Sequence, residues 1–219
     1  MVTRRSTLFL LAAGCCFGQP AAPPNPAFRQ IEDSPGLPRV LLIGDSISIG
    51  YTEPVRAELA AKANVHRIPE NGAATLSVTK LDAWLGAGHW DVIHFNFGLH
   101  DLKFMDNGLR QVPLADYEGN LRQIVGRLKR TGAKLVFATT TPVPNTKVNP
   151  PRLSGDVVEY NAAAKRIMAE SGVTVNDLYS LVIPRLSELQ LPANVHYTLE
   201  GYNVLGHQVA ESILRALGQ

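Results

Sequence analysis

Residues 40–46 read VLLIGDS, four apolar residues followed by Gly-Asp-Ser. A short continuous apolar run that ends at a turn signal is typical of a strand buried on both faces, as in a parallel sheet. The carboxyl edge of such a sheet is where open α/β proteins bind their ligands. The stretch therefore predicts a buried strand that presents Ser46 at that edge, which makes Ser46 a candidate nucleophile.

Strand-like and helix-like segments alternate along the rest of the chain. Further strands are expected near residues 65–69, 90–97, 134–139 and 173–175. Helices are expected from Glu53-Pro54 onward, over 75–85 and 117–130, from a cap at Asp156 to Ser171, and after an N-cap at Thr198.

This alternation predicts a three-layer α/β/α sandwich with a five-stranded, mainly parallel sheet. Right-handed crossovers leave few topologies, of which we expect the flavodoxin-like strand order. Under that order Ser46, Gly72, His100 and the loop 142–151 all emerge at one edge of the sheet.

Composition fits one domain and excludes several classes of partner. The 219 residues are 45% hydrophobic and 18% charged. Without Arg4 and Arg5, basic and acidic residues balance at 19 each. No basic patch suggests nucleic acid, and the apolar run at the N-terminus is too short for a transmembrane segment.

The N-terminus has the pattern of an export signal. A basic pair precedes a short apolar run and small residues, which predicts a signal peptide over 1–18. Residues 19–38 contain six prolines and are predicted to form a linker or strap before a domain at 39–219. Export is expected, and lipid anchoring through Cys15 is a less favoured variant. Because Cys15 and Cys16 are the only cysteines, the exported chain has no thiol.

A serine nucleophile needs a base, and His196 is the favoured histidine because it precedes the last helix in a loop. His66, His89, His94 and His207 have more ordinary structural or surface interpretations. A metal hydrolase built from His94, His100, Asp101 and His196 matches no recognisable spacing, so no metal or cofactor is expected.

Four blocks of sequence together resemble the GDSL, or SGNH, hydrolase family. They are GDS at 44–46, NG at 71–72, GLHD at 98–101 and VHYTLEGY at 195–202, in the family's order and with its usual spacing. The resemblance implies that Ser46 is the nucleophile and His196 the general base and then acid. It also implies an oxyanion hole formed by the N–H groups of Ser46 and Gly72 and a third donor at position 100.

Two positions depart from the family pattern. The usual asparagine of the third block is His100, whose neutral ring can still donate one N–H, and Asn96 is the fallback donor. The usual aspartate three residues before the histidine is Ala193. Three interpretations follow. A backbone carbonyl near Ala193 holds His196, or a carboxylate such as Asp101 or Glu200 holds it. In the third, the chain is a weak enzyme or pseudoenzyme, with an alanine that is either natural or introduced.

The sequence thus favours an exported serine esterase that removes small acyl groups, acetyl first, from a small-molecule or polysaccharide ester. The alternative is a catalytically impaired protein or carbohydrate-binding module on the same fold.

Overall fold

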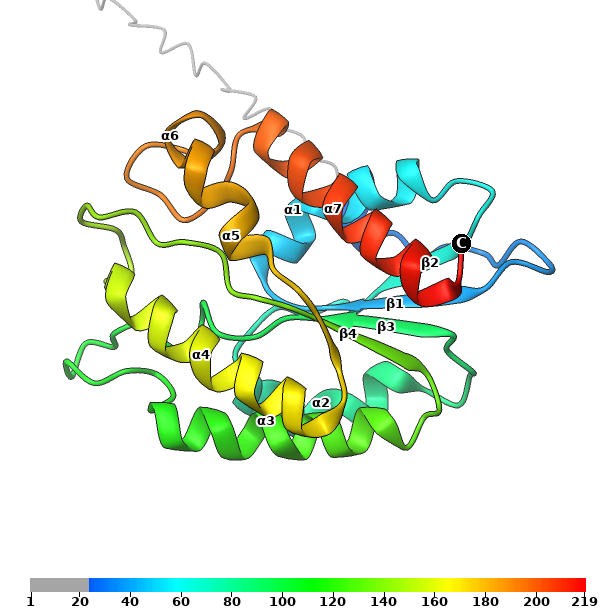
Figure 1. Ribbon diagram of the computed structural model, residues 1–219, viewed down its shortest axis with the longest axis horizontal. Coiled ribbons are helices and arrows are strands. Elements are labelled where there is room, and N and C mark those ends of the chain that lie inside the picture. Colours follow the sequence, from blue (N-terminus) through cyan, green and yellow to red (C-terminus); the bar gives the residue numbers. More distant parts are fainter. Residues whose placement is uncertain (1–23) are drawn as a thin grey trace, which may run out of the picture.

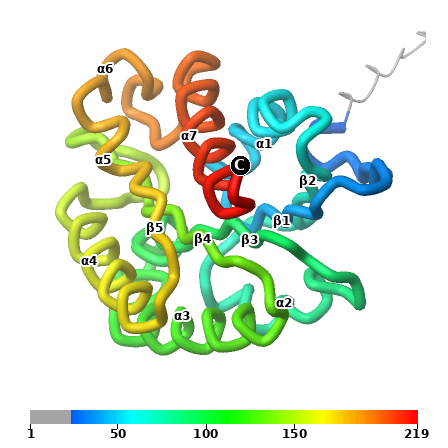
Figure 2. The backbone as a smooth tube through the Cα atoms, turned by 45° about the vertical axis from the view of Figure 1, so that its right-hand side comes forward, coloured from blue at the N-terminus to red at the C-terminus, as the bar shows by residue number. Residues whose placement is uncertain are grey.

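Five parallel strands form the centre of the computed structural model, which describes residues 24–219. The strands are β1 (Arg39–Ile43), β2 (Asn64–Arg67), β3 (Val92–Phe95), β4 (Lys134–Ala138) and β5 (Thr174–Asn176). Their order in the sheet is β2-β1-β3-β4-β5, the predicted flavodoxin-like order, which can be followed along the row of labels in Figure 2.

Helices cover both faces of the sheet (Figure 1). The long helices are α1 (Ser46–Glu58), α2 (Ala74–Leu85), α3 (Leu114–Lys129), α4 (Ser154–Ser171) and α7 (Leu199–Leu217). Helices α1 and α7 pack together on one face, and α2, α3 and α4 lie on the other. The short helices η1 (Pro26–Phe28), α5 (Leu178–Val182), η2 (Ile183–Arg185) and α6 (Leu186–Leu189) complete the fold. The predicted three-layer sandwich is confirmed.

The central strands are buried on both faces, as their apolar runs predicted. Residues 40–43 of β1 and all of β3 are buried. Burying such strands between two helical layers supplies most of the stabilisation of a parallel sheet.

The first helix begins earlier than predicted. Asp45 caps it by accepting a hydrogen bond from Ile47 N at 2.9 Å, so α1 starts at Ser46 and Pro54 lies inside it. The cap signal outweighs the proline, which is accommodated against Gly206 of α7, where an added Cβ would lie 2.4 Å from the proline ring. Ser46 therefore stands at a helix N-terminus as well as at a strand end.

The two other predicted caps had different outcomes. Thr198 does cap α7, with its hydroxyl accepting from Gly201 N at 3.0 Å. Asp156 does not cap α4, because that helix starts two residues earlier, at Ser154. Its carboxylate instead pairs with Arg110, whose Nε donates at 3.0 Å.

Residues 24–38 run as a strap along the outer edge of β2. Asn64 donates to the carbonyls of Ser34 and Leu37 and accepts from Ser34 N at 2.9 Å. Arg56 of α1 donates to the carbonyl of Pro26 at 3.0 Å. The predicted signal segment 1–18 and both cysteines lie outside the described residues. Within residues 24–219, no helix combines the length and apolar character needed to cross a bilayer.

Candidate active site

Ser46 and His196 are brought together from 150 residues apart. Ser46 is the first residue of α1, directly after β1, and His196 lies in the loop between α6 and α7. The Nε2 atom of His196 is 2.8 Å from the hydroxyl of Ser46. Both side chains are half-buried, so the pair stays open to a ligand. This is the distance at which an imidazole can take a proton from a serine.

Asn194 holds the other side of the imidazole. Its Oδ1 is 2.8 Å from His196 Nδ1 and also accepts from the His196 backbone N–H at 3.0 Å. A backbone N–H can only donate, so the atom facing it must be the amide oxygen. Nδ1 then donates to this oxygen, and Nε2 is left unprotonated toward Ser46. The asparagine thus selects the tautomer in which His196 can act as a base.

The electrostatic surroundings keep His196 neutral. Burial lowers its pKa from the ordinary value of 6.5; the Asp45 carboxylate opposes this shift and the Arg152 guanidinium adds to it. A neutral imidazole at neutral pH is the state that accepts the hydroxyl proton.

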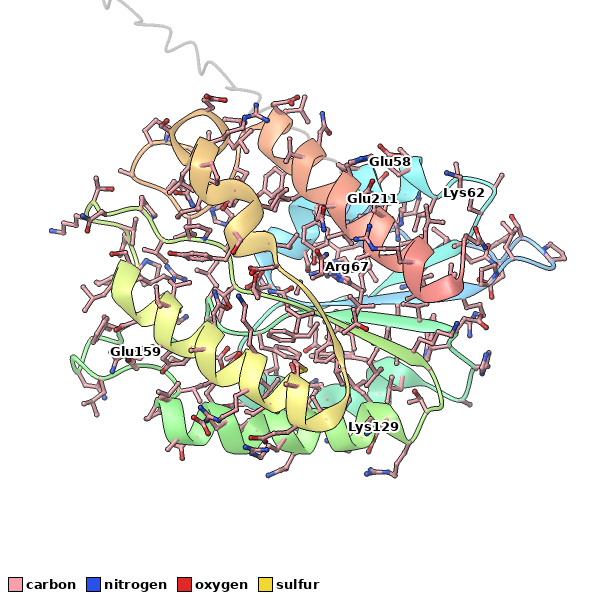
Figure 3. All side chains as sticks on the ribbon, viewed as in Figure 1. Glu58, Lys62, Arg67, Lys129, Glu159 and Glu211 are labelled. Atoms are coloured by element: carbon pink, nitrogen blue, oxygen red, sulfur yellow. The ribbon has the colours of Figure 1, made fainter. Side chains whose placement is uncertain are left out.

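The turn that carries Ser46 is fixed by buried polar groups. Besides capping α1, Asp45 accepts from the Asn96 side chain at 3.3 Å. Arg67 donates to the carbonyls of Gly44 and Asp45, each at 3.2 Å. Arg67 lies in the interior of the molecule, as Figure 3 shows, and is only 7% exposed. These contacts bind the ends of β1, β2 and β3 to one another beneath Ser46.

Gly72 lies between the carboxyl end of β2 and α2, at the same edge of the sheet. A Cβ there would come 2.8 Å from Cδ2 of Leu76, so a larger residue would require the end of that side chain to move. Two residues on, Ala74 N donates to Asp101 at 2.8 Å, which ties this segment to the loop after β3. Burial raises the pKa of Asp101 to about 7. Because Asp101 is used in this way, it is not the carboxylate that holds His196.

His100 lies in the loop after β3, close enough to His196 for the two rings to influence each other's charge. Burial lowers its pKa, and the Asp45 carboxylate opposes that shift while the positive charges of Lys103 and Arg152 add to it. Its neutral ring has one N–H, and makes no hydrogen bond to any residue from 24 to 219. Asn96, the fallback donor, is 5% exposed, and its amide already donates to Asp45. The geometry therefore favours His100 over Asn96 as a donor to a ligand.

Comparison with family models matches residues 42–204 to the GDSL-like lipase/acylhydrolase family. The chain belongs to this family. The matched range contains all four blocks that the sequence suggested, together with Ser46 and His196. The family resemblance predicted from the sequence is therefore confirmed.

Solved structures of esterases share the fold of this acylhydrolase family member. The lipase/acylhydrolase from Enterococcus faecalis has a TM-score of 0.70 at 21% identity, covering 81% of this chain and 95% of that one. The acetyl xylan esterase AlAXEase has a TM-score of 0.68 at 14% identity, covering 80% and 99%. The acetylxylan esterase Axe2 from Geobacillus stearothermophilus has 0.65 at 18%, covering 83% and 94%. Comparison with curated protein sequences gives no match.

Asn194 is the site residue that the sequence did not predict in this member of the GDSL-like family. None of the three alternatives considered for His196 includes it, because attention fell on Ala193. Ala193 is exposed and adopts a left-handed backbone with φ 50°, which places the next side chain against the histidine. An asparagine two residues before a histidine is a recognisable signal, since Asn side chains often accept from the backbone N–H two residues on. Glu200 is exposed in the first turn of α7 and does not hold the ring.

The residues of the metal alternative do not gather into a site. His94 is buried in β3, where its Nε2 faces the Asn176 amide at 3.3 Å, and burial lowers its pKa to about 3. Across residues 24–219, no three side chains of the metal-binding types are placed to share an ion.

Proposed function

We propose that this protein is a serine esterase of the SGNH type that removes small acyl groups, acetyl first, from carbohydrate esters. The observation that carries the proposal is the chain of contacts from Ser46 through His196 to Asn194, at 2.8 Å for each link. Family membership supports hydrolase chemistry. The acetyl group and the carbohydrate rest on the neighbours described as acetyl xylan esterases.

The proposed first step is acylation of Ser46. His196 Nε2 takes the hydroxyl proton while Oγ attacks the acyl carbonyl carbon. The imidazolium then gives this proton to the departing alcohol oxygen as the ester bond breaks. In the second step a water loses a proton to Nε2 and attacks the acyl carbonyl carbon. The imidazolium returns this proton to Ser46 Oγ as the acyl–Oγ bond breaks and the carboxylic acid leaves. Asn194 keeps the ring in position through both transfers.

The oxyanion formed in each step needs hydrogen-bond donors, and free backbone N–H groups at a helix N-terminus can supply them. In α1, the Ile47 N–H donates to the Asp45 side chain and the Ile49 N–H donates to the Asp45 carbonyl. The Ser46 N–H has no acceptor within residues 24–219. We assign this N–H, with Gly72 N–H and the His100 ring, to the oxyanion hole. Each such donor is worth roughly 3–4 kcal/mol in well-studied hydrolases.

The neutral amide of Asn194 gives this site a different character from an aspartate. It can fix the ring and its tautomer, but it adds no negative charge to stabilise the imidazolium. We therefore propose a working but slower enzyme. The alternative of an impaired protein rested on Ala193, and Asn194 supplies the hydrogen bond that Ala193 cannot.

Hydrolysis of p-nitrophenyl acetate tests the proposal. We expect a burst of p-nitrophenol equal to the enzyme concentration, and a loss of up to about six orders of magnitude in kcat in both Ser46→Ala and His196→Gln. The matched controls are Ser187→Ala and His207→Gln, which change exposed side chains away from the pair. Equal traces from the wild type and Ser46→Ala would exclude the esterase.

We also propose that the protein is exported with cleavage after residue 18. The support is the basic pair and apolar run within the first 14 residues. N-terminal sequencing of the protein recovered outside the cytoplasm should begin at Gln19, and a lipid on Cys15 would show the anchored variant instead.

A further inference from the structure

Arg152, in the loop between β4 and α4, is an almost buried cation without a carboxylate partner. Its side chain is 9% exposed. Nε donates to the Leu99 carbonyl at 2.8 Å and Nη1 to the Pro150 carbonyl at 3.1 Å. Nη2 makes no hydrogen bond within residues 24–219, yet it is not enclosed, so it remains accessible. Arginines are rarely buried to this degree unless an anion pairs with them.

Arg67 shows what a buried arginine with a purely structural role looks like in this protein. It is 7% exposed and donates from both terminal nitrogens to four carbonyls and the Ser48 hydroxyl. Its terminal nitrogens are fully used inside the protein. Arg152 is held by only two hydrogen bonds, from Nε and Nη1, and its Nη2 has no acceptor within residues 24–219.

The position of Arg152 points to a ligand at the proposed catalytic pair. Leu99, its hydrogen-bond acceptor, directly precedes His100, so the guanidinium lies beside the His100 loop. Its positive charge lowers the pKa of both His100 and His196. Lys103 adds a second positive charge on the His100 side, and it pairs with no acidic side chain among residues 24–219.

The two buried carboxylates of this region, Asp45 and Asp101, are already used, and Asp101 accepts from Ala74 N at 2.8 Å. Asp45 is 1% exposed and accepts from Ile47 N and Asn96 beneath Ser46. It forms no ion pair with Arg152. The charges facing the ligand side are therefore those of Arg152 and Lys103, with His100 and His196 neutral.

We propose that Arg152 binds a carboxylate carried by the substrate, so that the enzyme prefers esters of acidic sugars, such as O-acetylated uronic acids. This inference rests on the proposed esterase function and names its substrate class. Nη2 donates to the carboxylate while Nε and Nη1 keep the guanidinium in place, and Lys103 contributes charge. The carboxylate is only held, and takes no part in the acyl transfer.

The first test compares two substrates that differ only in charge: an O-acetylated methyl galacturonoside and its neutral methyl ester. We expect kcat/KM to be about tenfold higher for the acid, the worth of one charge-assisted hydrogen bond. In Arg152→Gln the ratio should fall to about one, chiefly through KM, and Arg152→Lys should keep part of it. Lys147→Gln, an exposed cation in the same loop, is the control that keeps the ratio.

Two results would overturn the proposal. One is equal activity of the wild type on both esters. The other is an equal fall of kcat on both esters in Arg152→Gln, which would place Arg152 at the oxyanion or in the loop structure instead. Thermal unfolding of each variant shows whether the loop survives the substitution.

Binding separates this proposal from the esterase function. Calorimetry on Ser46→Ala should show galacturonate binding about tenfold tighter than galactose, weaker at high salt, and equal to galactose once Arg152 is also changed. If p-nitrophenyl acetate is hydrolysed but galacturonate has no advantage, the substrate class is wrong and the esterase stands. If galacturonate binds without any ester hydrolysis, the esterase fails and the carboxylate site stands.

Discussion

The two halves of the proposed catalytic pair are held very differently. The turn that carries Ser46 lies over buried groups: Asp45 caps α1, and Arg67 and Asn96 tie that turn to the neighbouring strands. The loop that carries His196 is half-exposed, and the ring depends on one side chain, Asn194. Ser46 is therefore supported by a buried network that joins three strands, whereas His196 is held locally.

This difference separates stability from activity. A substitution beneath Ser46 breaks a network that joins three strands, so it should cost folding free energy. A substitution at Asn194 breaks two hydrogen bonds in a surface loop, so it should cost rate and leave the fold intact.

Arg67→Met should have the largest effect, on stability. Several buried carbonyls lose their donor, at about 1–3 kcal/mol each, so we expect the free energy of unfolding in urea to fall by about 3 kcal/mol or more. Arg122→Met is the control, because its ion pair with Glu170 is about half exposed and should change stability by less than about 0.5 kcal/mol. A similar small change in both variants would show that the turn beneath Ser46 is not held as described.

Asn194→Ala should lower kcat about tenfold while the midpoint of unfolding barely moves. One neutral hydrogen bond is worth about 0.5–1.5 kcal/mol, and a tenfold change in rate corresponds to 1.36 kcal/mol. Steady-state hydrolysis of p-nitrophenyl acetate measures the effect. If kcat is unchanged, Asn194 does not position the histidine.

The sequence predicted the fold better than it predicted the support of the site. The strand ends follow from apolar runs and turn residues, which are local signals. The strand order, and with it the edge shared by Ser46, Gly72 and His100, follows from the right-handed crossover rule. The start of α1 was missed because the rule for proline at a helix start was applied to Pro54, and the cap at Asp45 was overlooked. The short helices between residues 178 and 189 have no clear hydrophobic periodicity, so the sequence did not predict them.

The role of Asn194 depends on loop geometry that periodicity does not contain. The left-handed backbone at Ala193 determines that the Asn194 side chain contacts the ring. Alanine rarely adopts this conformation, so the sequence does not indicate it. The contacts of Arg67 likewise join residues from β2 to the end of β1, and only the folded register reveals them.

The pH profile should respond to charge at position 194. Activity needs neutral His196, whose pKa is lowered by burial, so kcat/KM of the wild type should fall only below pH 6.5. A carboxylate in Asn194→Asp favours the imidazolium and raises that pKa, so the acid limb should move up by about one pH unit. Rates measured from pH 4 to 9 test this, and an unmoved limb would contradict the contact.

Ala193→Asp should have the smallest effect. The side chain at position 193 is exposed while Asn194 occupies the ring nitrogen, so we expect kcat to stay within about threefold of the wild type. Asp tolerates the left-handed backbone at this position, so the loop should keep its shape. A rise of tenfold or more would mean that position 193 can take over the histidine.

The role of Asn194 is tested most directly by measuring which nitrogen of the His196 ring carries the proton, because we propose that Asn194 selects the tautomer. Nitrogen-15 NMR of histidine-labelled protein at neutral pH, assigned with His196→Gln, should show the proton on Nδ1 and an unprotonated Nε2. In Asn194→Ala this preference should weaken. A wild-type ring with its proton on Nε2 would contradict the account, since that nitrogen could not then accept the proton of Ser46.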